Sequence, residues 1–533
     1  MGEVLQRIAA CVLCTTLFCF ASLKTVGALQ QGGYDNKTFW AWLNRKGNMQ
    51  FNRLCVFALC LALASAVTAL CFSFLGVKNA LLVSGLVFVL LSVGYCVAEQ
   101  KYALKVPLKR TGRAIRLFAV YYLFVAVFSY LLIAILKFLA VLNGSDLYGL
   151  IAYVPFAITP ICLPFLLCFA NLIEGAFEKM RNKKFVERAG QVLDETQITR
   201  VAVVGSFGKT SVKNILKTIL SERFSVVETP ASYNTPIGVA KTVFSPAFSG
   251  KQVLIAEMGA RKSGDIAELC KMVKPDYALF TGVCEQHIST FGSEENAFKE
   301  KSEILKCGAF VVCGEGLRIR VEAAFGHPEN VAFADFAAVK DIHYYATETE
   351  FSLRLGTETV KVKTPLLGCA GAENILLAAT LAYKMGLTAM EIERGIAKIA
   401  PIEHRLQLFE SGGIYILDDG YNCNPRGAKE ALVALSRFAG RKCVVTPGIV
   451  ECGVLEEKIN GELGAEIARV APDTVILVGE TLVGAVKKGY LDAGGSEKNL
   501  FSAATLDGAK SILAERIGAG DAALFLNDLP DVY

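Results

Sequence analysis

The stretch that decides the fold is Val201–Leu220, which reads VAVVGSFGKTSVKNILKTIL. It opens with a short apolar run typical of a buried strand, breaks at Gly205, and passes through Gly208 into an amphipathic helical pattern. A strand, a glycine-containing loop and a helix form the setting in which Gly-Lys-Thr-Ser indicates phosphate binding rather than a simple turn. The loop is shorter than the general GxxxxGKS/T pattern, because Val203 stands where the first glycine would be.

The residues of this loop suit a nucleoside triphosphate. Gly205 and Gly208 allow the backbone N–H groups to turn inward around an anion, and the following helix N-terminus adds positive potential. Lys209 supplies a mobile cation, and the hydroxyl of Thr210 can be a ligand of Mg²⁺. The expected ATP-binding residues of the loop are Gly205, Ser206, Gly208, Lys209, Thr210 and Ser211.

The composition divides the chain into an apolar part and a soluble part. The 533 residues are enough for three domains. Residues 1–175 hold long apolar runs, whereas residues 180–533 have the composition of an ordinary soluble α/β protein. The net charge of +5 gives no reason to expect a nucleic-acid partner. The 17 cysteines are scattered without a paired framework, which indicates buried thiols in a reducing compartment.

Five apolar segments are candidates for membrane spans, since each has roughly the 20 residues that a bilayer requires. They are residues 8–28, 54–75, 80–98, 117–141 and 148–170. The connections after the first, third and fifth segments are basic, and the two alternate connections are not. Because basic connections remain in the cytoplasm, we expect a multi-pass protein of the cell membrane with its N-terminus outside and its soluble part cytoplasmic.

The soluble part shows repeated strand–helix alternation, which is typical of parallel sheets covered by helices on both faces. The apolar runs are 201–204, 253–256, 277–280, 415–417, 443–445 and 474–478. A more antiparallel patch near residues 330–365 precedes a helix at Glu373–Met385, and a new first strand follows residues 400–404. We expect four parts: an α-helical membrane region (1–175), a linker (176–197), an ATP-binding α/β domain (198–400) and a Rossmann-like α/β domain (401–533).

Polar residues follow several of these runs, at the edge where open α/β sheets bind ligands. Glu257 ends one run, His287 follows another, and Lys301 lies fourteen residues beyond His287 on an expected helix. Asp418 and Asp419 end a later run. Each residue alone is weak evidence, because a lone strand-end glutamate is as often a cap as a ligand and a lone histidine is usually structural. Several such elements beside one phosphate loop favour a shared site.

Taken together, these stretches resemble the Mur ligases, a family of ATP-dependent amide-forming enzymes of cell-wall synthesis. The short loop GSFGKTS is similar to the phosphate loop of that family. Further similar stretches are NTPIGVAKT, EMGARKSGDI, HISTFGSEENAFKEKSEI, HRLQ and DDGYNCNP. Together they are most similar to the members that add D-alanyl-D-alanine, over roughly residues 198–480. Folylpolyglutamate synthase shares the architecture but matches these stretches less well.

The resemblance implies a Mur-ligase-type central P-loop domain, a C-terminal Rossmann-like domain and a set of site residues. Lys209, His287 and Lys301 would be catalytic. Magnesium would be held by Thr210, Glu257, His287 and, if it is carbamylated, Lys301. The nucleotide would also contact Asn374, Arg405, Asp419, Tyr421 and Asn424, and the substrate would contact Asn234 and Thr235.

The family reaction implied for this chain uses ATP and Mg²⁺. A muramoyl-peptide carboxylate attacks the γ-phosphate to give an acyl phosphate, and an amine such as D-Ala-D-Ala then displaces phosphate. The magnesium ion, Lys209 and the loop amides would stabilise the developing negative charge. The implied partners are the muramoyl-peptide precursor, an amino-acid or dipeptide acceptor, and other proteins of cell-wall synthesis.

The chain also departs from the family pattern. Glu373 stands where the nucleotide-binding GxHN stretch usually has histidine, and the segments TPGIVECGVLEEKIN and LNDLPDVY differ from those of the D-Ala-D-Ala ligases. Five apolar segments stand in place of the domain that grips the UDP-sugar. We therefore expect the carboxylate donor to be presented at the membrane surface, in a UDP-linked or a lipid-linked form.

Three alternatives remain open from the residues alone. The chain could ligate another lipid-linked or wall-polymer substrate. It could be a non-catalytic membrane scaffold switched by nucleotide, although Lys209, Glu257, His287 and Lys301 together speak for a complete metal site. It could be an ATP-driven transporter, although a second phosphate-binding motif is not evident. ATP hydrolysis that depends on an amine acceptor would distinguish the ligase from the other two.

Overall fold

The computed structural model describes most of the chain in two compact units, Met1–Asn182 and Lys183–Asp531. The described residues are 2–44, 49–72, 74, 77–100, 108–143, 155–231, 233–284, 291, 293–421, 423–450, 452, 455–479 and 481–527.

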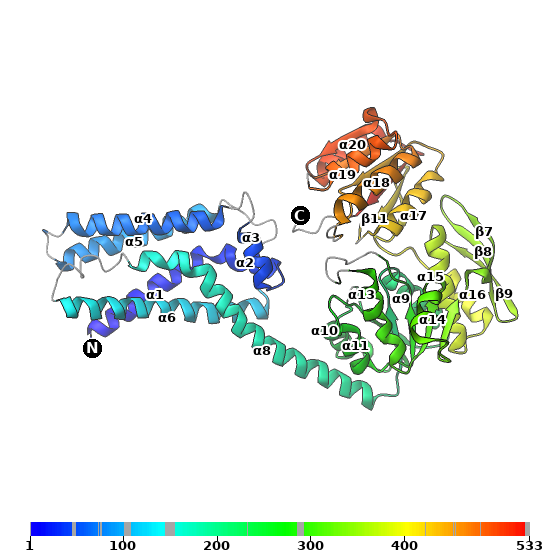
Figure 1. Cartoon of the computed structure of the whole chain (residues 1–533), viewed down its shortest axis with the longest axis horizontal. Helices are drawn as coiled ribbons and strands as arrows, with labels where there is room; N and C mark the ends of the chain where they lie inside the picture. The colour runs from blue at the N-terminus through cyan, green and yellow to red at the C-terminus, as the bar shows by residue number, and fades with distance from the viewer. Residues whose placement is uncertain are drawn as a thin grey trace. The chain divides into compact units, whose positions relative to one another are not determined.

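The first unit is helical (Figure 1). Its helices are α1 (Gly2–Ala21), α2 (Leu23–Gln31), α3 (Asn36–Leu43), α4 (Gln50–Cys71), α5 (Val77–Gln100), α6 (Gly112–Asn143), the 3-10 turn η2 (Pro155–Ile158) and α8 (Thr159–Glu195). Buried aromatic and aliphatic side chains from α1, α4, α5, α6 and α8 form one core, with Phe18, Leu61, Phe88, Tyr121 and Leu163 at its centre.

Five membrane spans were expected here, and the described residues contain three helices that are long and apolar enough to cross a membrane, or four if a bent pair is one span. The three lie at Gln50–Thr68, Gly112–Leu132 and Thr159–Glu195, and α5 holds a shorter apolar stretch at Val83–Glu99. The first expected span is bent by 47° between α1 and α2. At this break the hydroxyl of Ser22 donates to the Cys19 carbonyl, and Lys24 follows within ion-pair distance of Glu99, at 3.4 Å.

The last expected span and the expected linker belong to a single helix. Helix α8 begins at Thr159 and continues to Glu195, so the charged residues after 174 extend the apolar helix. The start of the expected segment, residues 148–154, lies outside the described residues.

Three segments lie at the same end of the helical unit: the end of α2, the segment before α6 and the middle of α8. The side-chain amide of Gln30 exchanges two hydrogen bonds of 2.8 Å with the backbone of Lys109, which ties the end of α2 to the segment before α6. The buried carboxylate of Glu174 pairs with Arg113 and Arg116, each at 3.1 Å, which ties the start of α6 to the middle of α8. The described parts of the connections that follow the first, third and fifth apolar segments therefore meet at one end of the unit.

The second unit begins with a parallel six-stranded sheet in the order β2-β3-β1-β4-β5-β6. The strands are β1 (Thr199–Val204), β2 (Val226–Glu228), β3 (Val253–Glu257), β4 (Tyr277–Phe280), β5 (Phe310–Gly314) and β6 (Val331–Ala334). Side chains alternate between the faces of a strand. Accordingly, Val201 and Val203 of β1 enter one buried cluster, and Ala202 and Val204 enter another. Both faces of this sheet are covered.

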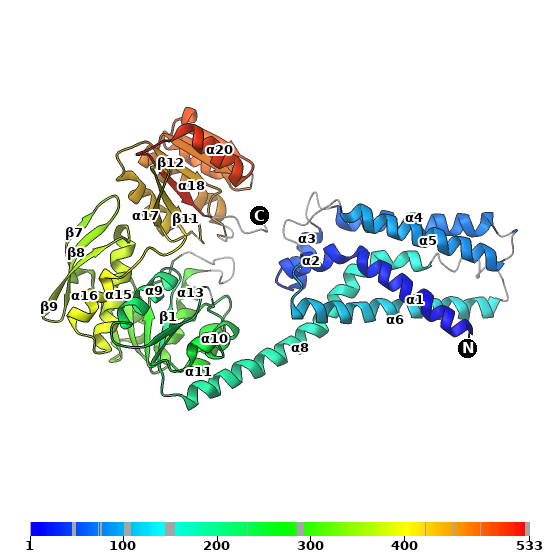
Figure 2. The same cartoon turned by 180° about the vertical axis from the view of Figure 1, so that it is seen from behind.

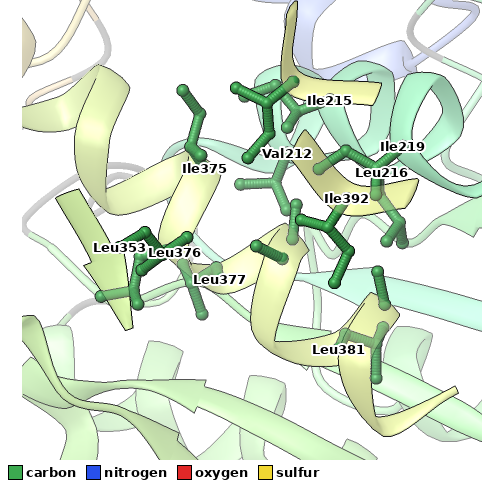
Figure 3. Packing of buried hydrophobic residues seen from close by; sticks show 14 of the residues in the cluster. Val212, Ile215, Leu216, Ile219, Leu353, Ile375, Leu376, Leu377, Leu381 and Ile392 are labelled. Atoms are coloured by element: carbon green, nitrogen blue, oxygen red, sulfur yellow. The ribbon is translucent and has the colours of Figure 1, made fainter. Parts of the chain in front are cut away.

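Helices from different parts of the chain cover the two faces (Figure 2). One face packs against α9 (Lys209–Leu220), α15 (Gly368–Lys384) and α16 (Ala389–Ala397). The other packs against the end of α8 and against α10 (Pro236–Val243), α11 (Asp265–Val273), α13 (Glu294–Lys301) and α14 (Arg318–Phe325). Figure 3 shows how Val212, Ile215 and Ile219 of α9 meet Ile375 of α15 and Ile392 of α16 in the first cluster.

A small antiparallel sheet and a second large sheet complete the unit. The small sheet is β7 (Val339–Tyr344), β8 (Thr349–Leu355) and β9 (Glu358–Thr364), as the patch near residues 330–365 predicts. The large sheet has the order β10-β11-β15-β12-β13-β14, with only β10 antiparallel among these described strands. Its strands are β10 (Gln407–Ser411), β11 (Ile414–Asp419), β12 (Lys442–Thr446), β13 (Thr474–Val478), β14 (Leu500–Ala503) and β15 (Ala522–Leu526).

Four helices cover this last sheet: α17 (Pro425–Ser436), α18 (Glu456–Val470), α19 (Val483–Asp492) and α20 (Leu506–Arg516). The short 3-10 turns of the second unit are η3 (Pro246–Phe248), η4 (Ser302–Lys306), η5 (Glu315–Leu317), η6 (Phe336–Ala338) and η8 (Glu497–Asn499). All six apolar runs predicted as strands are strands, and the predicted fold class, a helical region followed by α/β sheets, is confirmed.

The contact between α18 and α19 generates a prediction about stability. A Cβ at Gly489 would lie 1.9 Å from the carbonyl oxygen of Gly461, whereas a Cβ at Gly484 on the same helix would meet nothing within 4 Å. Gly489→Ala should therefore destabilise the second unit by about 1–3 kcal/mol through overpacking. Gly484→Ala should stabilise it slightly, because alanine favours helix. Thermal denaturation followed by circular dichroism measures both, and equal melting temperatures for the two variants would contradict the close contact.

Candidate active site

The loop between β1 and α9 stands at the centre of the first sheet, because β1 lies between β3 and β4. Both glycines of the loop are required: a side chain at Gly205 would clash with a neighbour, and Gly208 has a backbone conformation that favours glycine. A Cβ at Gly205 would lie 1.9 Å from the hydroxyl oxygen of Thr281. Gly208 has the left-handed φ of 72°, and a Cβ there would lie 2.9 Å from Oδ1 of Asn374. The loop can therefore pass close to β4 and α15 with its backbone exposed to a ligand.

Polar groups of the loop point inward. The Nζ atom of Lys209 donates to the carbonyl oxygens of Gly205 (2.9 Å) and Ser206 (3.2 Å), so this cation lies across the loop. Burial is the largest cause that lowers the pKa of Lys209, Glu257 opposes that shift, and Arg405 adds to it. The Ser206 hydroxyl is buried and has no hydrogen-bond partner among the described residues. An unsatisfied buried hydroxyl beside a cation fits a loop that receives an anionic ligand.

The carboxylate of Glu257 stands at the end of β3 and is almost completely buried. It accepts hydrogen bonds from the hydroxyl of Thr210 (3.0 Å) and from the side-chain amide of Asn234 (3.3 Å). Thr210 is the second residue of α9, so the register of β1 beside β3 brings the loop and the carboxylate together. Three of the predicted residues, Thr210, Asn234 and Glu257, therefore form one cluster.

Thr235 and Asn424 have defined structural positions. The hydroxyl of Thr235 accepts a hydrogen bond from the backbone N–H of Gly238 and caps α10. The side chain of Asn424 accepts one from Gly427 and caps α17. Side chains used as caps have one acceptor committed to the helix. His287 lies outside the described residues, so its predicted place at the metal is not tested.

Lys301 is a buried lysine at the end of α13. Its Nζ atom has no hydrogen-bond partner among the described residues and lies 5.0 Å from the centre of the Phe291 ring. Burial, as the largest cause, and the neighbouring charge of Lys209 together lower the pKa of Lys301 to about 8. The effect of Lys209 indicates that the two ammonium groups are near enough to interact.

A cavity beside the loop is lined by several of the residues predicted to contact nucleotide. Gly208, Ser211, Asn374, Arg405, Asp419 and Asn424 line it. The guanidinium of Arg405 donates to the carbonyl of Tyr421 (2.7 Å) and lies 4.7 Å from the centre of its ring. Burial raises the pKa of Asp419, and a hydrogen bond from the backbone N–H of Leu406 opposes that shift. Six of the predicted nucleotide residues thus line one cavity, from the elements of both large sheets, and Tyr421 contacts one of the six, Arg405.

Glu373 stands where the family pattern has histidine, and the structure gives it a partner that the sequence does not reveal. Its carboxylate pairs with Arg426 at the start of α17, at 2.5 Å. The guanidinium of Arg426 also lies 4.9 Å from the centre of the Phe207 ring in the phosphate loop. Phe207, Glu373 and Arg426 line both this cavity and a second one that extends over the ends of β4, β5 and β6.

Sequence reasoning missed Lys213, the fourth residue of the cluster at Glu257. The Nζ atom of Lys213 lies 3.3 Å from Oε2 of Glu257, and both side chains are 2% exposed. One signal was available, because a charged residue on the apolar face of an amphipathic helix indicates a buried partner. The identity of that partner could not be read from the sequence, since 44 positions separate the two residues.

The oxygen atoms of Thr210 and Glu257 beside the loop are suitable ligands for magnesium. In the ranges that the structure describes, no three His, Cys, Asp or Glu side chains gather as a metal site. Magnesium at nucleotide sites needs fewer protein ligands, since phosphate oxygens and water complete its shell. A hydroxyl and a carboxylate 3.0 Å apart, both oxygen donors beside a phosphate loop, fit that requirement.

Comparison with known proteins identifies relatives of this architecture. Residues 203–382 match the Mur ligase middle domain family. The UDP-N-acetylmuramoyl-tripeptide–D-alanyl-D-alanine ligase of Escherichia coli K12 is 30% identical over 312 residues, which cover 56% of this chain and 68% of that protein. The protein of the same name from Bacillus subtilis 168 is 26% identical over 296 residues, which cover 54% and 64%. The chain thus spans about two thirds of the length of these relatives.

Solved structures agree with this relationship. The MurF ligase of Thermotoga maritima, in complex with ADP, matches with a TM-score of 0.59 at 26% identity, over 66% of this chain and 81% of that one. A MurF structure from Acinetobacter baumannii matches with a TM-score of 0.60 at 22% identity, over 66% and 78%, and so shows the shared fold.

The buried amine of Lys301 generates a pH-dependent prediction. Its folded-state pKa of about 8 lies below the ordinary value of 10.5. Between these values the unfolded chain binds more protons than the folded one, so the native protein gains stability as the pH rises. In carbon-dioxide-free buffer, Lys301→Met should therefore stabilise the protein by about 3 kcal/mol at pH 7, and by less at pH 9.5.

Thermal denaturation at both pH values measures this effect, with the exposed Lys299→Met on the same helix as the matched control. An equal gain for Lys301→Met at pH 7 and pH 9.5 would contradict the lowered pKa, because it would show that the amine has the same pKa in the folded and the unfolded protein.

Proposed function

Because this chain belongs to the Mur ligase family of ATP-dependent amide-forming ligases, we propose that it joins D-Ala-D-Ala or a similar amine to the carboxylate of a muramoyl-peptide precursor. The observation that carries the proposal is the cluster at the phosphate loop, where the Thr210 hydroxyl meets the buried Glu257 carboxylate and Lys209 lies across the loop. A hydroxyl, a carboxylate and a cation at one loop are the parts that phosphoryl transfer requires.

The proposed reaction proceeds in two steps at this loop. An oxygen of the donor carboxylate attacks the γ-phosphorus of ATP, the bond to ADP breaks, and an acyl phosphate forms. The amine nitrogen then attacks the acyl carbon and loses a proton, and phosphate leaves with the former carboxylate oxygen. In both steps Lys209 and the backbone N–H groups of Ser206–Thr210 would stabilise negative charge on the transferred phosphoryl group. Asn234 and Thr235 would orient the substrate beside it.

Thr210 and Glu257 would hold the magnesium ion of ATP, which when bound neutralises charge on the β- and γ-phosphates. His287 and Lys301 are proposed as further ligands. A bare ammonium at Lys301 could not serve, but a carbamate could, because it carries a negative charge on oxygen. Carbon dioxide adds to a neutral amine, and the lowered pKa of Lys301, about 8, leaves part of it neutral near physiological pH. Its lack of a hydrogen-bond partner among the described residues supports this role.

The nucleoside of ATP would lie in the cavity lined by Asn374, Arg405 and Asp419, with Tyr421 and Asn424 at its edge. The pairing of Glu373 with Arg426 would place an ion pair where the family pattern has histidine. We therefore expect this chain to contact the adenosine differently from the relatives.

The helical unit would anchor the enzyme in the cell membrane, with the basic end in the cytoplasm. Three observations support this: its apolar helices, the meeting of three basic connections at one end, and the presence of both tryptophans, Trp40 and Trp42, on α3. Tryptophan is enriched at membrane interfaces. The anchor would present a donor at the membrane surface, and a lipid-linked muramoyl-peptide is the substrate that such a position favours.

Phosphate release by the detergent-solubilised full-length protein tests this function. We expect turnover with muramoyl-tripeptide and D-Ala-D-Ala, and faster turnover with the lipid-linked donor than with the UDP-linked donor. Lys209→Ala should reduce the rate at least about 100-fold, because it removes charge stabilisation from the transferred phosphoryl group. Lys217→Ala is the matched control: it lies on the same helix, is 44% exposed and pairs with Glu228, so it should keep the wild-type rate.

The donor comparison separates the proposals. Efficient use of the UDP-linked donor alone would contradict the membrane-surface donor but support the ligase. Nucleotide binding without phosphate release from either donor would contradict the proposed substrates, and would favour a different amine, another wall-polymer substrate or a nucleotide-switched scaffold.

A further inference from the structure

Lys213 is a charged side chain on the buried face of α9. Its neighbours on that face are Val212, Ile215 and Leu216, which belong to the core of the first sheet. The Lys213 side chain is 2% exposed. Burying an ammonium group is unfavourable unless it is paired and hydrogen-bonded, so its partners determine what it does.

The three N–H bonds of the ammonium group have three acceptors. Nζ of Lys213 donates to the carbonyl oxygens of Thr229 (2.7 Å) and Ala231 (2.9 Å). Its third neighbour is Oε2 of Glu257 at 3.3 Å. The ammonium group is therefore compensated by two hydrogen bonds and one ion pair.

Glu257 in turn is surrounded by donors. Besides Lys213, the hydroxyl of Thr210 and the side-chain amide of Asn234 donate to its carboxylate. Its backbone N–H donates to the hydroxyl of Thr229 (3.0 Å), which fixes the end of β3. Among the described residues, Lys213 is the cation within ion-pair distance of this carboxylate.

The same ammonium group also holds the segment that leads to Asn234. Ala231 has a φ of 45°, a left-handed conformation that is unfavourable for a residue with a Cβ and persists only where contacts enforce it. The hydrogen bond from Lys213 to the Ala231 carbonyl is such a contact. The chain then reaches Asn234, whose amide donates to Glu257 from the other side. Lys213 therefore supports the carboxylate both directly and through this segment.

We propose that Lys213 is the counter-ion that positions Glu257 and sets the affinity of the site for magnesium. In the metal-free protein the ammonium pairs with the buried carboxylate and holds it in place. When magnesium binds, its affinity is moderated because Lys213 already neutralises part of the charge on Glu257. This inference rests on the proposed function in one respect, that Glu257 is a ligand of the magnesium ion of ATP.

The test is a magnesium titration of the binding of fluorescent ADP to the full-length protein in detergent. Lys213→Met removes the charge and keeps the length of the side chain. Without Lys213 the charge of Glu257 is uncompensated, so the half-saturating Mg²⁺ concentration should fall roughly tenfold. For the same reason, binding of ADP in the absence of Mg²⁺ should weaken, since phosphate is repelled by the carboxylate. If Lys213 had only a structural role, its substitution would weaken both the binding of Mg²⁺ and the binding of ADP without Mg²⁺.

Two further variants make the result specific. Lys217→Met, on the exposed face of α9, should leave both equilibria unchanged. The double variant Lys213→Met/Glu257→Gln carries neither charge, so in the absence of Mg²⁺ it should bind ADP as the wild type does. It should not show the higher affinity for Mg²⁺ that is expected of Lys213→Met alone. If Lys213→Met alone fails to fold while the double variant binds ADP, the counter-ion role is supported. If the double variant also fails to bind ADP, Lys213 serves the fold through its carbonyl contacts and the inference is wrong.

These outcomes are distinct from those of the ligase test. A protein with the expected magnesium response but no amide formation would contradict the proposed function and leave the role of Lys213 intact. A protein that forms the amide, and whose Lys213→Met variant has the wild-type magnesium response, would contradict the inference alone.

Discussion

A buried carboxylate must be compensated by hydrogen-bond donors or by a cation, and at Glu257 this constraint organises the site. The compensating groups come from two places: Thr210 and Lys213 on α9, and Asn234 before α10. The hydroxyl of Thr229, after β2, accepts a hydrogen bond from the backbone N–H of Glu257 and so fixes the end of β3. The carboxylate therefore links the start of α9, which follows the phosphate loop, to the segment that leads to Asn234. Loss of any one of these contacts leaves the others with an unsatisfied buried charge.

The parallel sheet makes this convergence possible. Because β1 and β3 are neighbours in register, with Val203 opposite Glu257, the loop after β1 begins at the level of the carboxylate. The carboxyl ends of β4 and β5 lie on the same edge, where Thr281 packs against the loop and Gly314 packs against the carbonyl of Thr281. Close approach then requires glycine at Gly205, where a side chain would overlap Thr281. The chemistry of the site thus depends on backbone packing that aliphatic residues such as Val201 and Ile255 provide from the core.

Much of this arrangement could be predicted from the sequence, and the physical reasons for success and failure differ. Short apolar runs bounded by polar residues predicted the strands, and strand ends predicted Glu257, because both signals are local. Lys213 and Arg426 were missed, since their roles depend on partners that are remote in sequence, Glu257 and Glu373. The break at Ser22 was missed for a related reason: hydropathy averages over a window, whereas one hydroxyl bonded to the preceding turn and a nearby lysine interrupt the helix.

The central claim is that this phosphate loop transfers a phosphoryl group to a carboxylate before an amide bond forms. The most direct measurement uses a muramoyl-tripeptide donor whose terminal carboxylate carries ¹⁸O, with unlabelled ATP and D-Ala-D-Ala, and analyses the released phosphate by mass spectrometry. An acyl phosphate route transfers one carboxylate oxygen to phosphate, so we predict one ¹⁸O atom in each phosphate released. Amide formation accompanied by unlabelled phosphate would contradict the account.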